Sequence, residues 1–283
     1  MTDSLKSLQY DMGNIGDLLK HGVMAEFIRW WSEINPDKNN FIFLDPFCGL
    51  CWEYPENECI LRRLCNLRDN HDGDFAIINA QPGIDDGKYY GSTHVVINQT
   101  LQIPRKKKLQ PVIYVSDESP DKIMALEKSN EYIKKLSCHG FSKSDGYLIL
   151  DYINGGNINA DMALIDPYCE MDKIISYLSE IIKACEKTAI ILFVIINNKG
   201  KWKEIKQKLS PNSIILTCPS TGETSCIRGE GRKVGVVLSS YLLTKTKNDS
   251  LLNNIRCYAD ALSKIAFLPD AKKKICVFPP HHN

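Results

Sequence analysis

The chain has 283 residues and a formal net charge of +1, with 43% hydrophobic and 24% charged residues. This composition is ordinary for a globular protein and excludes disorder and collagen-like repeats, and the near-neutral charge excludes a global basic field for nucleic acid. No apolar run approaches the roughly 18–20 residues that span a bilayer, so we expect no membrane partner. The N-terminus lacks the basic start and apolar core of a signal peptide, and we expect a cytoplasmic protein.

The first predicted elements are a helix and a short buried strand. Apolar side chains recur at helical spacing over residues 15–34, and Pro36 marks the end of this helix. An apolar strand follows at 41–44. Residues 50–110 then lack the regular alternation of strands and helices, which indicates an insertion with its own short helix near 56–67.

The remainder of the chain alternates strands with helices. The predicted strands lie at 112–116, 162–165, 189–196, 213–217, 233–243 and 275–278, and the predicted helices lie at 120–136, 147–153, 171–185, 200–209 and 250–265. This order predicts an α/β fold, in which a mostly parallel sheet carries helices on both faces.

Two predicted strands end in the same dipeptide. Asp45-Pro46 closes the strand at 41–44, and Asp166-Pro167 closes the strand at 162–165. Ligands of open α/β sheets bind in the crevice outside the carboxyl ends of the strands. We therefore expect both ends to face one crevice, where one end holds a cofactor and the other carries out chemistry.

Further small or acidic residues follow predicted strand ends and turns. Gly49 permits the backbone to approach a ligand closely. Asp117, at the end of the next strand, is placed to accept hydrogen bonds from ribose hydroxyls, and Asp145 to accept one from the amine of an adenine. Each carboxylate taken singly also fits a cap or a turn residue, so the hypothesis of a nucleoside site depends on their order along the chain.

The turn Asp166-Pro167-Tyr168 fits the methylation of an amine. An aromatic exocyclic amine is a poor nucleophile because its lone pair is delocalised into the ring. The Asp166 carboxylate and the Pro167 carbonyl can accept its two N–H bonds and rehybridise the nitrogen toward a methyl donor, while Tyr168 stacks the base. The alternative is that Asp166 caps the helix that begins near residue 170.

Cysteines and basic segments add weaker signals. Of the eleven cysteines, Cys48 and Cys51 form one Cys-x-x-Cys. No second such pair and no His pair completes a tetrahedral set, so we expect no metal site and reduced thiols. The basic segments at 105–108 and 228–233 fit solvated loops, or phosphate contacts if they flank the crevice.

At these residues the chain resembles a family, the adenine-N6 methyltransferases of large-subunit ribosomal RNA known as methyltransferase J. The most specific match is Gly-Asn-Ile-Gly-Asp-Leu-Leu-Lys-His at 13–21, which is similar to the family's signature Gly-Asn-x-x-Asp-x-Leu-Lys-His. The matches that follow in the same order are the turn at 45–49, Tyr90-Gly91-Ser92, the acidic strand end at 117–120, Asp145-Gly146 and Ile165-Asp166-Pro167.

The resemblance implies a Rossmann-like methyltransferase domain that binds S-adenosylmethionine, over residues 1–49 and 91–283, with residues 50–90 as an inserted helical subdomain. It implies Asp166 as the catalytic carboxylate, with Pro167 and Tyr168 beside it. The residues that it places around the cofactor are Lys20, His21, Asp45, Phe47, Gly49, Ser92, Asp117, Asp145 and Gly146. It further implies a nucleic-acid substrate, with structured RNA favoured and DNA as the alternative.

The chain departs from the family at two turns. Cys169 stands where the family has its stacking tyrosine, Tyr168 replaces a proline, and Phe47 replaces a typical histidine. These departures leave a second hypothesis open, a methyltransferase-like binding or partner subunit whose site has lost activity. A nicotinamide-dependent dehydrogenase is disfavoured because no Gly-x-Gly-x-x-Gly follows any predicted strand.

Overall fold

A computed structural model describes most of the chain. The described residues are 15–48, 53–55, 58–70, 74–104, 108–117, 137–140, 146–167, 170–219, 233–245, 248–267 and 274–280. The predicted helix at 120–136 and most of both basic segments lie outside these ranges, as do Gly49, Asp145 and Tyr168 of the predicted site.

The described residues form an eight-stranded sheet in the order β10-β8-β9-β7-β6-β1-β4-β5. The strands are β1 (Asn40–Asp45), β4 (Gln110–Val115), β5 (Ser137–Gly140), β6 (Met162–Ile165), β7 (Ala189–Ile195), β8 (Ser213–Cys218), β9 (Val234–Ser239) and β10 (Cys276–Phe278). The run β5-β4-β1-β6-β7 is parallel throughout, whereas β9 is antiparallel to both β7 and β8, and β10 is antiparallel to β8. The predicted α/β class with a mostly parallel sheet is confirmed.

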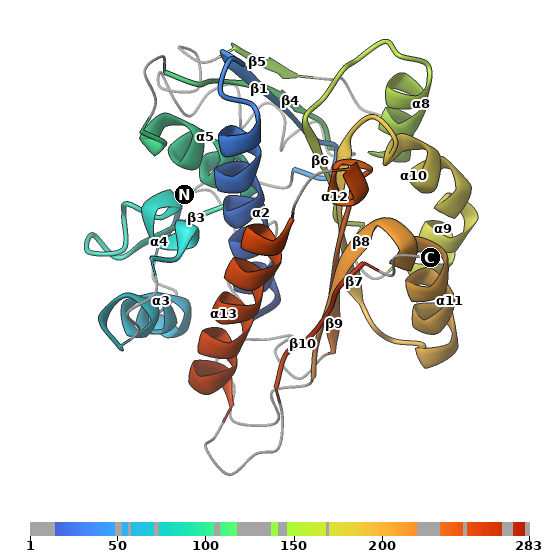
Figure 1. Ribbon diagram of the computed structural model, residues 1–283. Helices are drawn as coiled ribbons and strands as arrows, with labels where there is room; N and C mark the ends of the chain where they lie inside the picture. The colour runs from blue at the N-terminus through green and yellow to red at the C-terminus, as the bar shows by residue number, and fades with distance from the viewer. Residues whose placement is uncertain are drawn as a thin grey trace, which may run out of the picture.

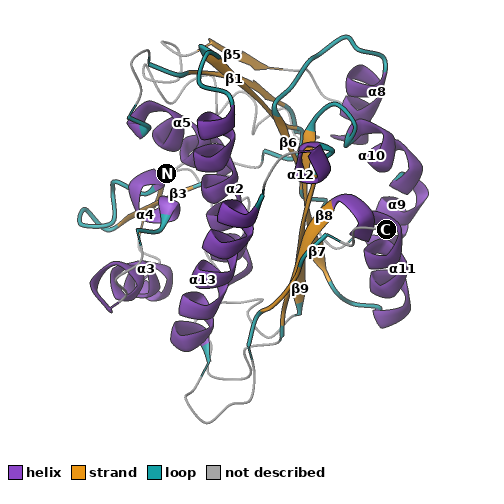
Figure 2. Cartoon of the chain, in the orientation of Figure 1, coloured by secondary structure: helices purple, strands orange, loops and turns teal. Residues whose placement is uncertain are grey.

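Helices cover both faces of this sheet, as Figures 1 and 2 show. On the left of the view lie α2 (Ile15–Ile34), α5 (Ser92–Gln102) and α13 (Asp249–Ala266). On the right lie α8 (Ile149–Asn154), α9 (Met171–Ser176), α10 (Leu178–Ala184) and α11 (Lys199–Leu209). The shorter helical elements are η1 (Gly146–Leu148), η2 (Ser210–Asn212) and α12 (Leu242–Lys245).

Two apolar cores fill the layers between the helices and the sheet. Strand β7 reads Ala-Ile-Ile-Leu-Phe-Val-Ile and is almost wholly buried, as expected for a central strand that helices cover on both faces. Because side chains alternate along a strand, Ile191 and Phe193 enter the core beneath α2 and α13, and Ile190 and Leu192 enter the core beneath α9 to α11. Among the described residues no helix has the length and apolar character that a bilayer crossing requires.

The segment between β1 and β4 contains two more helices and a two-stranded antiparallel sheet before α5. These elements are β2 (Glu53–Pro55), α3 (Glu58–Asn70), α4 (Ala76–Ala80) and β3 (Lys88–Tyr90), with β2 and β3 paired antiparallel. Their buried side chains, including Leu64, Ile77 and Tyr89, join the same core as α2 and α13. The division at 50–90 that the resemblance implies stays a prediction.

Two predicted elements differ in length from those observed. The strand predicted at 233–243 ends at Ser239, where its partner β8 begins at Ser213, so residues beyond it have no strand to pair with. The chain instead turns into α12. The helix predicted at 171–185 is two helices, because the chain breaks at Tyr177, whose ring stacks on Tyr147 at a centroid distance of 4.5 Å.

Candidate functional site

Three aspartates meet at the carboxyl edge of the sheet. Asp45 is the last residue of β1, Asp117 follows β4 by two residues, and Asp166 follows β6 directly. Strand β1 lies between β4 and β6 in parallel register, so these three strand ends are neighbours. Ser116 and the turn after β1 are also joined, since Ser116 N–H donates to the Asp45 carbonyl at 3.0 Å and Cys48 N–H to the Ser116 carbonyl at 3.1 Å.

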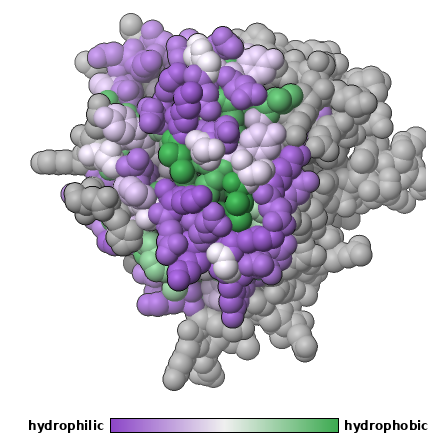
Figure 3. All heavy atoms as spheres, turned by 90° about the vertical axis from the view of Figure 1, so that its right-hand side faces the viewer, coloured by the Kyte–Doolittle hydropathy of each residue, from purple (hydrophilic) through white to green (hydrophobic). Residues whose placement is uncertain are grey.

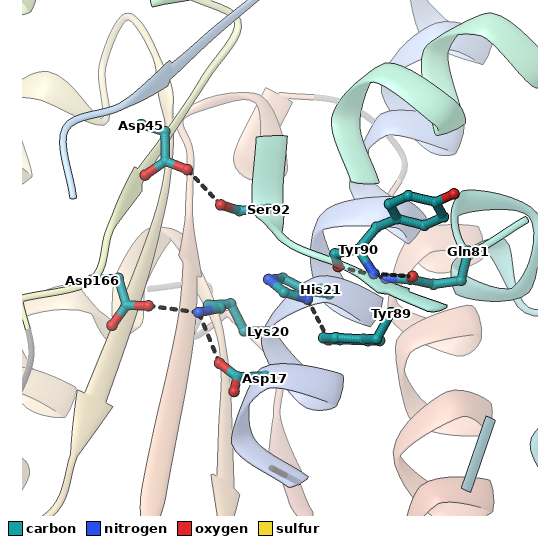
Figure 4. Close-up of polar contacts among 9 residues, drawn as sticks. All are labelled: Asp17, Lys20, His21, Asp45, Gln81, Tyr89, Tyr90, Ser92 and Asp166. Atoms are coloured by element: carbon teal, nitrogen blue, oxygen red, sulfur yellow. Dashed lines mark hydrogen bonds and ion pairs between the residues drawn. The ribbon is translucent and has the colours of Figure 1, made fainter. Parts of the chain in front are cut away.

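Lys20, on helix α2, forms an ion pair with Asp166 at this edge. Its Nζ donates to Asp166 Oδ2 at 2.6 Å and to Asp17 Oδ1 at 3.1 Å, as Figure 4 shows. Asp17 and Lys20 are three residues apart on one helix, which places them on the same face. The Lys20 Nζ also lies 5.0 Å from the centroid of the Phe193 ring on β7.

This ion pair is largely buried, since the Lys20 side chain is 5% exposed and the Asp166 side chain is 19% exposed. Burial alone lowers the pKa of Lys20, but the carboxylates of Asp166 and Asp17 outweigh it and hold this pKa above the ordinary range. Burial raises the pKa of Asp166, and the Lys20 cation opposes that rise. Lys20 therefore favours the ionised form of the Asp166 carboxyl group, against the effect of burial.

Asp45 has a fully buried carboxyl group that accepts a hydrogen bond from a serine hydroxyl. Ser92 Oγ, at the start of α5, donates to Asp45 Oδ2 at 2.5 Å. Burial raises the pKa of Asp45 to about 7, against the lowering effects of the Ser92 hydrogen bond and of Lys20. Among the described residues its second oxygen, Oδ1, has no hydrogen-bond partner. A buried oxygen without a hydrogen-bond partner lowers the stability of the fold unless a ligand or a water molecule pairs with it.

His21 is a second buried polar group with an unmatched atom. Its Nδ1 lies 2.5 Å from the Tyr89 hydroxyl, and the two rings stack at a centroid distance of 5.7 Å. Within the described part of the chain its Nε2 has no hydrogen-bond partner. Burial and the neighbouring Lys20 cation lower the pKa of His21 to about 3, so the ring is neutral near pH 7.

The aromatic ring of Phe47 packs against Gly146. A Cβ atom placed on this glycine would lie 2.5 Å from Cζ of the Phe47 ring, so no side chain fits there. The Phe47 ring also meets the Tyr147 ring edge-on at 5.4 Å. Phe47, in the turn after β1, thus packs directly against the backbone at the start of η1.

Comparison with known proteins supports the fold and leaves the family open. The crystal structure of LPL1258, a DUF519 protein from Legionella pneumophila, has a TM-score of 0.68 to this chain at 15% identity, over 95% of this chain and 98% of that chain. Human methyltransferase-like protein 13, in complex with SAH, has a TM-score of 0.42 at 12% identity, over 89% and 96% of the two chains. The METTL16 MTase domain has a TM-score of 0.42 at 9% identity, over 76% and 66%. No protein-family model matches the sequence, and neither does any curated protein sequence.

The sheet has a Rossmann-like topology. The predicted site residues that the structure describes either lie around the carboxyl edge of this sheet or contact residues that lie there. They are Lys20, His21, Asp45, Phe47, Ser92, Asp117, Gly146, Asp166 and Pro167. Gly49, Asp145 and Tyr168 are outside the described ranges, and their assignment stays a prediction. Within the described residues no group of His, Cys, Asp and Glu side chains could hold a metal ion.

Two residues of this candidate site were not predicted. Asp17 belongs to the signature at 13–21, but only its contact with Lys20 reveals its part in the site. Tyr89 precedes the matched step at 90–92, and its partner His21 lies 68 residues away in sequence. The spacing of Asp17 and Lys20 on a helix is a signal that the sequence offers, whereas the Tyr89 contact depends on how the segment before α5 packs.

Proposed function

We propose that this protein is an S-adenosylmethionine-dependent methyltransferase that methylates adenine N6 in a nucleic acid, with structured RNA favoured. The observation that carries the proposal is the position of Asp166, which directly follows β6, beside Asp45 and Asp117, and is paired with Lys20 at 2.6 Å. The order of these residues along the chain is that of the methyltransferase J family, which supports the same activity.

The unmatched polar atoms at this edge fit a polar cofactor. Asp45 Oδ1 and His21 Nε2 are both buried and lack a partner among the described residues. Ribose hydroxyls and the amino-acid end of S-adenosylmethionine offer the donors and acceptors that these atoms need. We propose that Lys20, His21, Asp45, Ser92 and Asp117 line its site. When bound, the cofactor supplies an electrophilic methyl group on a sulfonium.

Asp166 acts on the acceptor amine. Its Oδ2 is held by Lys20, so its Oδ1 is the oxygen that accepts an N–H of the adenine amine. Withdrawing N–H density toward a carboxylate makes the nitrogen lone pair available for attack on the methyl group. The Pro167 carbonyl, the second acceptor proposed for this amine, also accepts a hydrogen bond from Glu170 N–H at 3.2 Å.

A methyl-transfer assay on Asp166→Ala tests this assignment. Transfer of labelled methyl groups from S-adenosylmethionine to RNA transcribed in vitro should fall by at least about 10³-fold, because the interaction exists only in the transition state. Affinity for S-adenosylhomocysteine should change by less than about threefold. Asp151→Ala, which removes an exposed aspartate on α8, is the matched control.

Two results would contradict the proposal in different ways. Full transfer by Asp166→Ala would show that this carboxylate is not catalytic. Cofactor binding by the wild type without transfer to RNA, DNA or small amines would instead favour the partner-subunit hypothesis, which rests on Cys169 standing in the place of the family's stacking tyrosine.

A further inference from the structure

Helix α11 is strongly basic, with the sequence Lys-Gly-Lys-Trp-Lys-Glu-Ile-Lys-Gln-Lys-Leu. Its buried face consists of Trp202, Ile205 and Leu209, which pack in the core beneath the sheet. The five lysines lie on the flanks of this face, and the only acidic residue in the helix is Glu204. The sequence predicts the helix but not how these charges divide between its two sides.

On one flank, acidic partners neutralise the lysines. Lys201 Nζ forms an ion pair with Asp172 of α9, and Lys208 Nζ forms one with Glu204 at 3.2 Å. This flank therefore faces α9 and carries little net charge. Exposed pairs of this kind contribute little to stability, but they do cancel the local field.

On the other flank, Lys199, Lys203 and Lys206 stand at spacings of four and three residues, which line them up on one side of the helix. Lys206 Nζ lies over the rings of Trp202 and Phe278, at 5.9 and 5.2 Å from their centroids. No acidic side chain in the described part of the chain lies within ion-pair distance of the other two lysines. We call these three residues the lysine stripe.

Helix stability does not explain the start of this stripe. The first turn of α11 contains Lys199 and Lys201 and no acidic residue, although the helix dipole favours negative charge there. Asn198 caps the same turn, with its Oδ1 accepting from Lys201 N–H at 3.0 Å. The helix therefore begins at a conventional cap but carries positive charges at the end where they cost stability.

The position of α11 brings the stripe to the edge that holds Asp166. Strand β7 lies beside β6 in parallel register, and α11 begins four residues after β7 ends. Asp166 likewise follows β6 at the same edge, and α9 and α11 are neighbours in Figure 1. The first turn of α11 is thus at the carboxyl edge, where ligands of such sheets bind.

The side of the molecule formed by α8 to α11 is mostly hydrophilic, with a small apolar patch near its centre, as Figure 3 shows. The exposed large apolar residues Leu148, Tyr152 and Ile182 belong to η1, α8 and α10, and the exposed Phe278 ring on β10 contacts Lys206. A charged partner fits this side better than an apolar one.

We propose that the lysine stripe of α11 binds the phosphate backbone of the RNA whose adenine reaches Asp166. This inference rests on the proposed function. Lysine contacts to phosphate position a nucleic acid without reading its sequence. Because the whole chain has a net charge of only +1, a local stripe supplies the attraction that the overall charge does not.

The test compares two double variants of the same helix. Lys199→Gln with Lys203→Gln removes two charges from the stripe, and Lys201→Gln with Lys208→Gln removes two from the opposite flank. The probe is a fluorescently labelled RNA hairpin with an unpaired adenine in its loop. Its dissociation constant is measured by anisotropy for the full chain over a series of potassium chloride concentrations.

The stripe variant should weaken binding by roughly tenfold and lower the slope of log K against log salt by about 1.4 to 1.8, while the control pair leaves the slope almost unchanged. Equal effects of the two pairs, or none from the stripe pair, would overturn the inference. Calorimetry with S-adenosylhomocysteine on the same proteins distinguishes failure of the stripe inference from failure of the proposed function. Normal cofactor binding with an unresponsive stripe leaves the proposed function standing, whereas a wild type that binds no cofactor removes its basis and that of the stripe.

Discussion

The hydrogen bond between His21 and Tyr89 determines which ring nitrogen is available to a ligand. The His21 ring is neutral near pH 7 and carries one proton, because burial and Lys20 lower its pKa to about 3. If the Tyr89 hydroxyl donates to Nδ1, the proton resides on Nε2, the buried atom without a partner in the described residues. Tyr89 is then a positioning residue that presents an N–H donor to the proposed cofactor.

Tyr89→Phe keeps the stacked ring and removes only the hydroxyl. We expect affinity for S-adenosylhomocysteine, measured by calorimetry, to fall by roughly 3- to 10-fold, since one hydrogen bond contributes about 1 kcal/mol. Tyr90→Phe is the neighbouring control, because Tyr90 stacks on His94 instead. Equal losses in the two variants would mean that Tyr89 serves the packing of β3 and not His21.

Asp45 should make stability depend on pH. Its folded pKa of about 7 exceeds its unfolded value of 3.8, so the folded state binds the proton more tightly. Its contribution to the free energy of unfolding is fully present below about pH 4 and is lost as the pH rises through about 7. The total change is up to roughly 4 kcal/mol. We expect Asp45→Asn to become more stable relative to wild type as pH rises from about 5 to 8.

Thermal unfolding of both proteins across this pH range checks the expectation. His21 contributes in the opposite direction, with stability that rises with pH between about 3 and 6.5, but it does so equally in both proteins and cancels in the difference. Asp37→Asn, at an exposed aspartate, should run parallel to wild type. A constant difference between Asp45→Asn and wild type would show that Asp45 is not protonated in the fold.

Part of the site could be predicted from residue order alone. Asp45, Asp117 and Asp166 each follow a short apolar segment, and strand ends in a parallel sheet share an edge. The Lys20–Asp166 ion pair spans 146 residues of sequence. Its geometry follows from the packing of α2 against the sheet, which no local pattern encodes.

At the scale of elements, α2 and α13 pack unusually closely. A Cβ atom on Gly22 would lie 2.1 Å from Cε1 of Tyr258, so the tyrosine ring occupies the space that a side chain would take. The Tyr258 hydroxyl donates to the Leu18 carbonyl at 2.6 Å within the same contact. Since α2 also carries Lys20 and His21, this contact helps to position the site.

Gly22→Ala should therefore destabilise the protein, although alanine normally favours a helix. Overpacking of this kind costs about 1–3 kcal/mol, against a helix-propensity gain of about 1 kcal/mol. Chemical denaturation of Gly22→Ala, Tyr258→Leu and the double variant gives the coupling between the two positions. We expect the double variant to lose less stability than the sum of the single variants, and strict additivity would contradict the contact.

The predicted elements agree best with the structure where the apolar periodicity of the sequence is clear. The helix predicted at 15–34 has those bounds in the structure, and the strand at 162–165 does too. Helix α5 was not predicted because it buries polar side chains, which hide its periodicity. Thr100, for example, is buried with its hydroxyl donating to backbone carbonyls one turn earlier in its own helix.

At the scale of the whole molecule, five parallel strands bring their carboxyl ends to one edge, and α2 covers that edge from one side with Lys20. Helices α9 and α11, which follow β6 and β7, begin on the other side. Cofactor chemistry at the strand ends and nucleic-acid binding along α11 would thus be adjacent. The arrangement explains why residues from distant parts of the chain belong to one site.

Calorimetric titration of S-adenosylmethionine and S-adenosylhomocysteine into the wild type and Asp117→Ala tests the central claim most directly. Asp117 is buried two residues after β4 ends, next to the Asp45 turn, so its loss should affect the proposed cofactor site itself. Asp86→Ala, at an exposed aspartate, is the control. We expect micromolar binding to the wild type and the control, and at least about tenfold weaker binding to Asp117→Ala, which corresponds to about 1.4 kcal/mol. Absence of binding to the wild type would contradict the account.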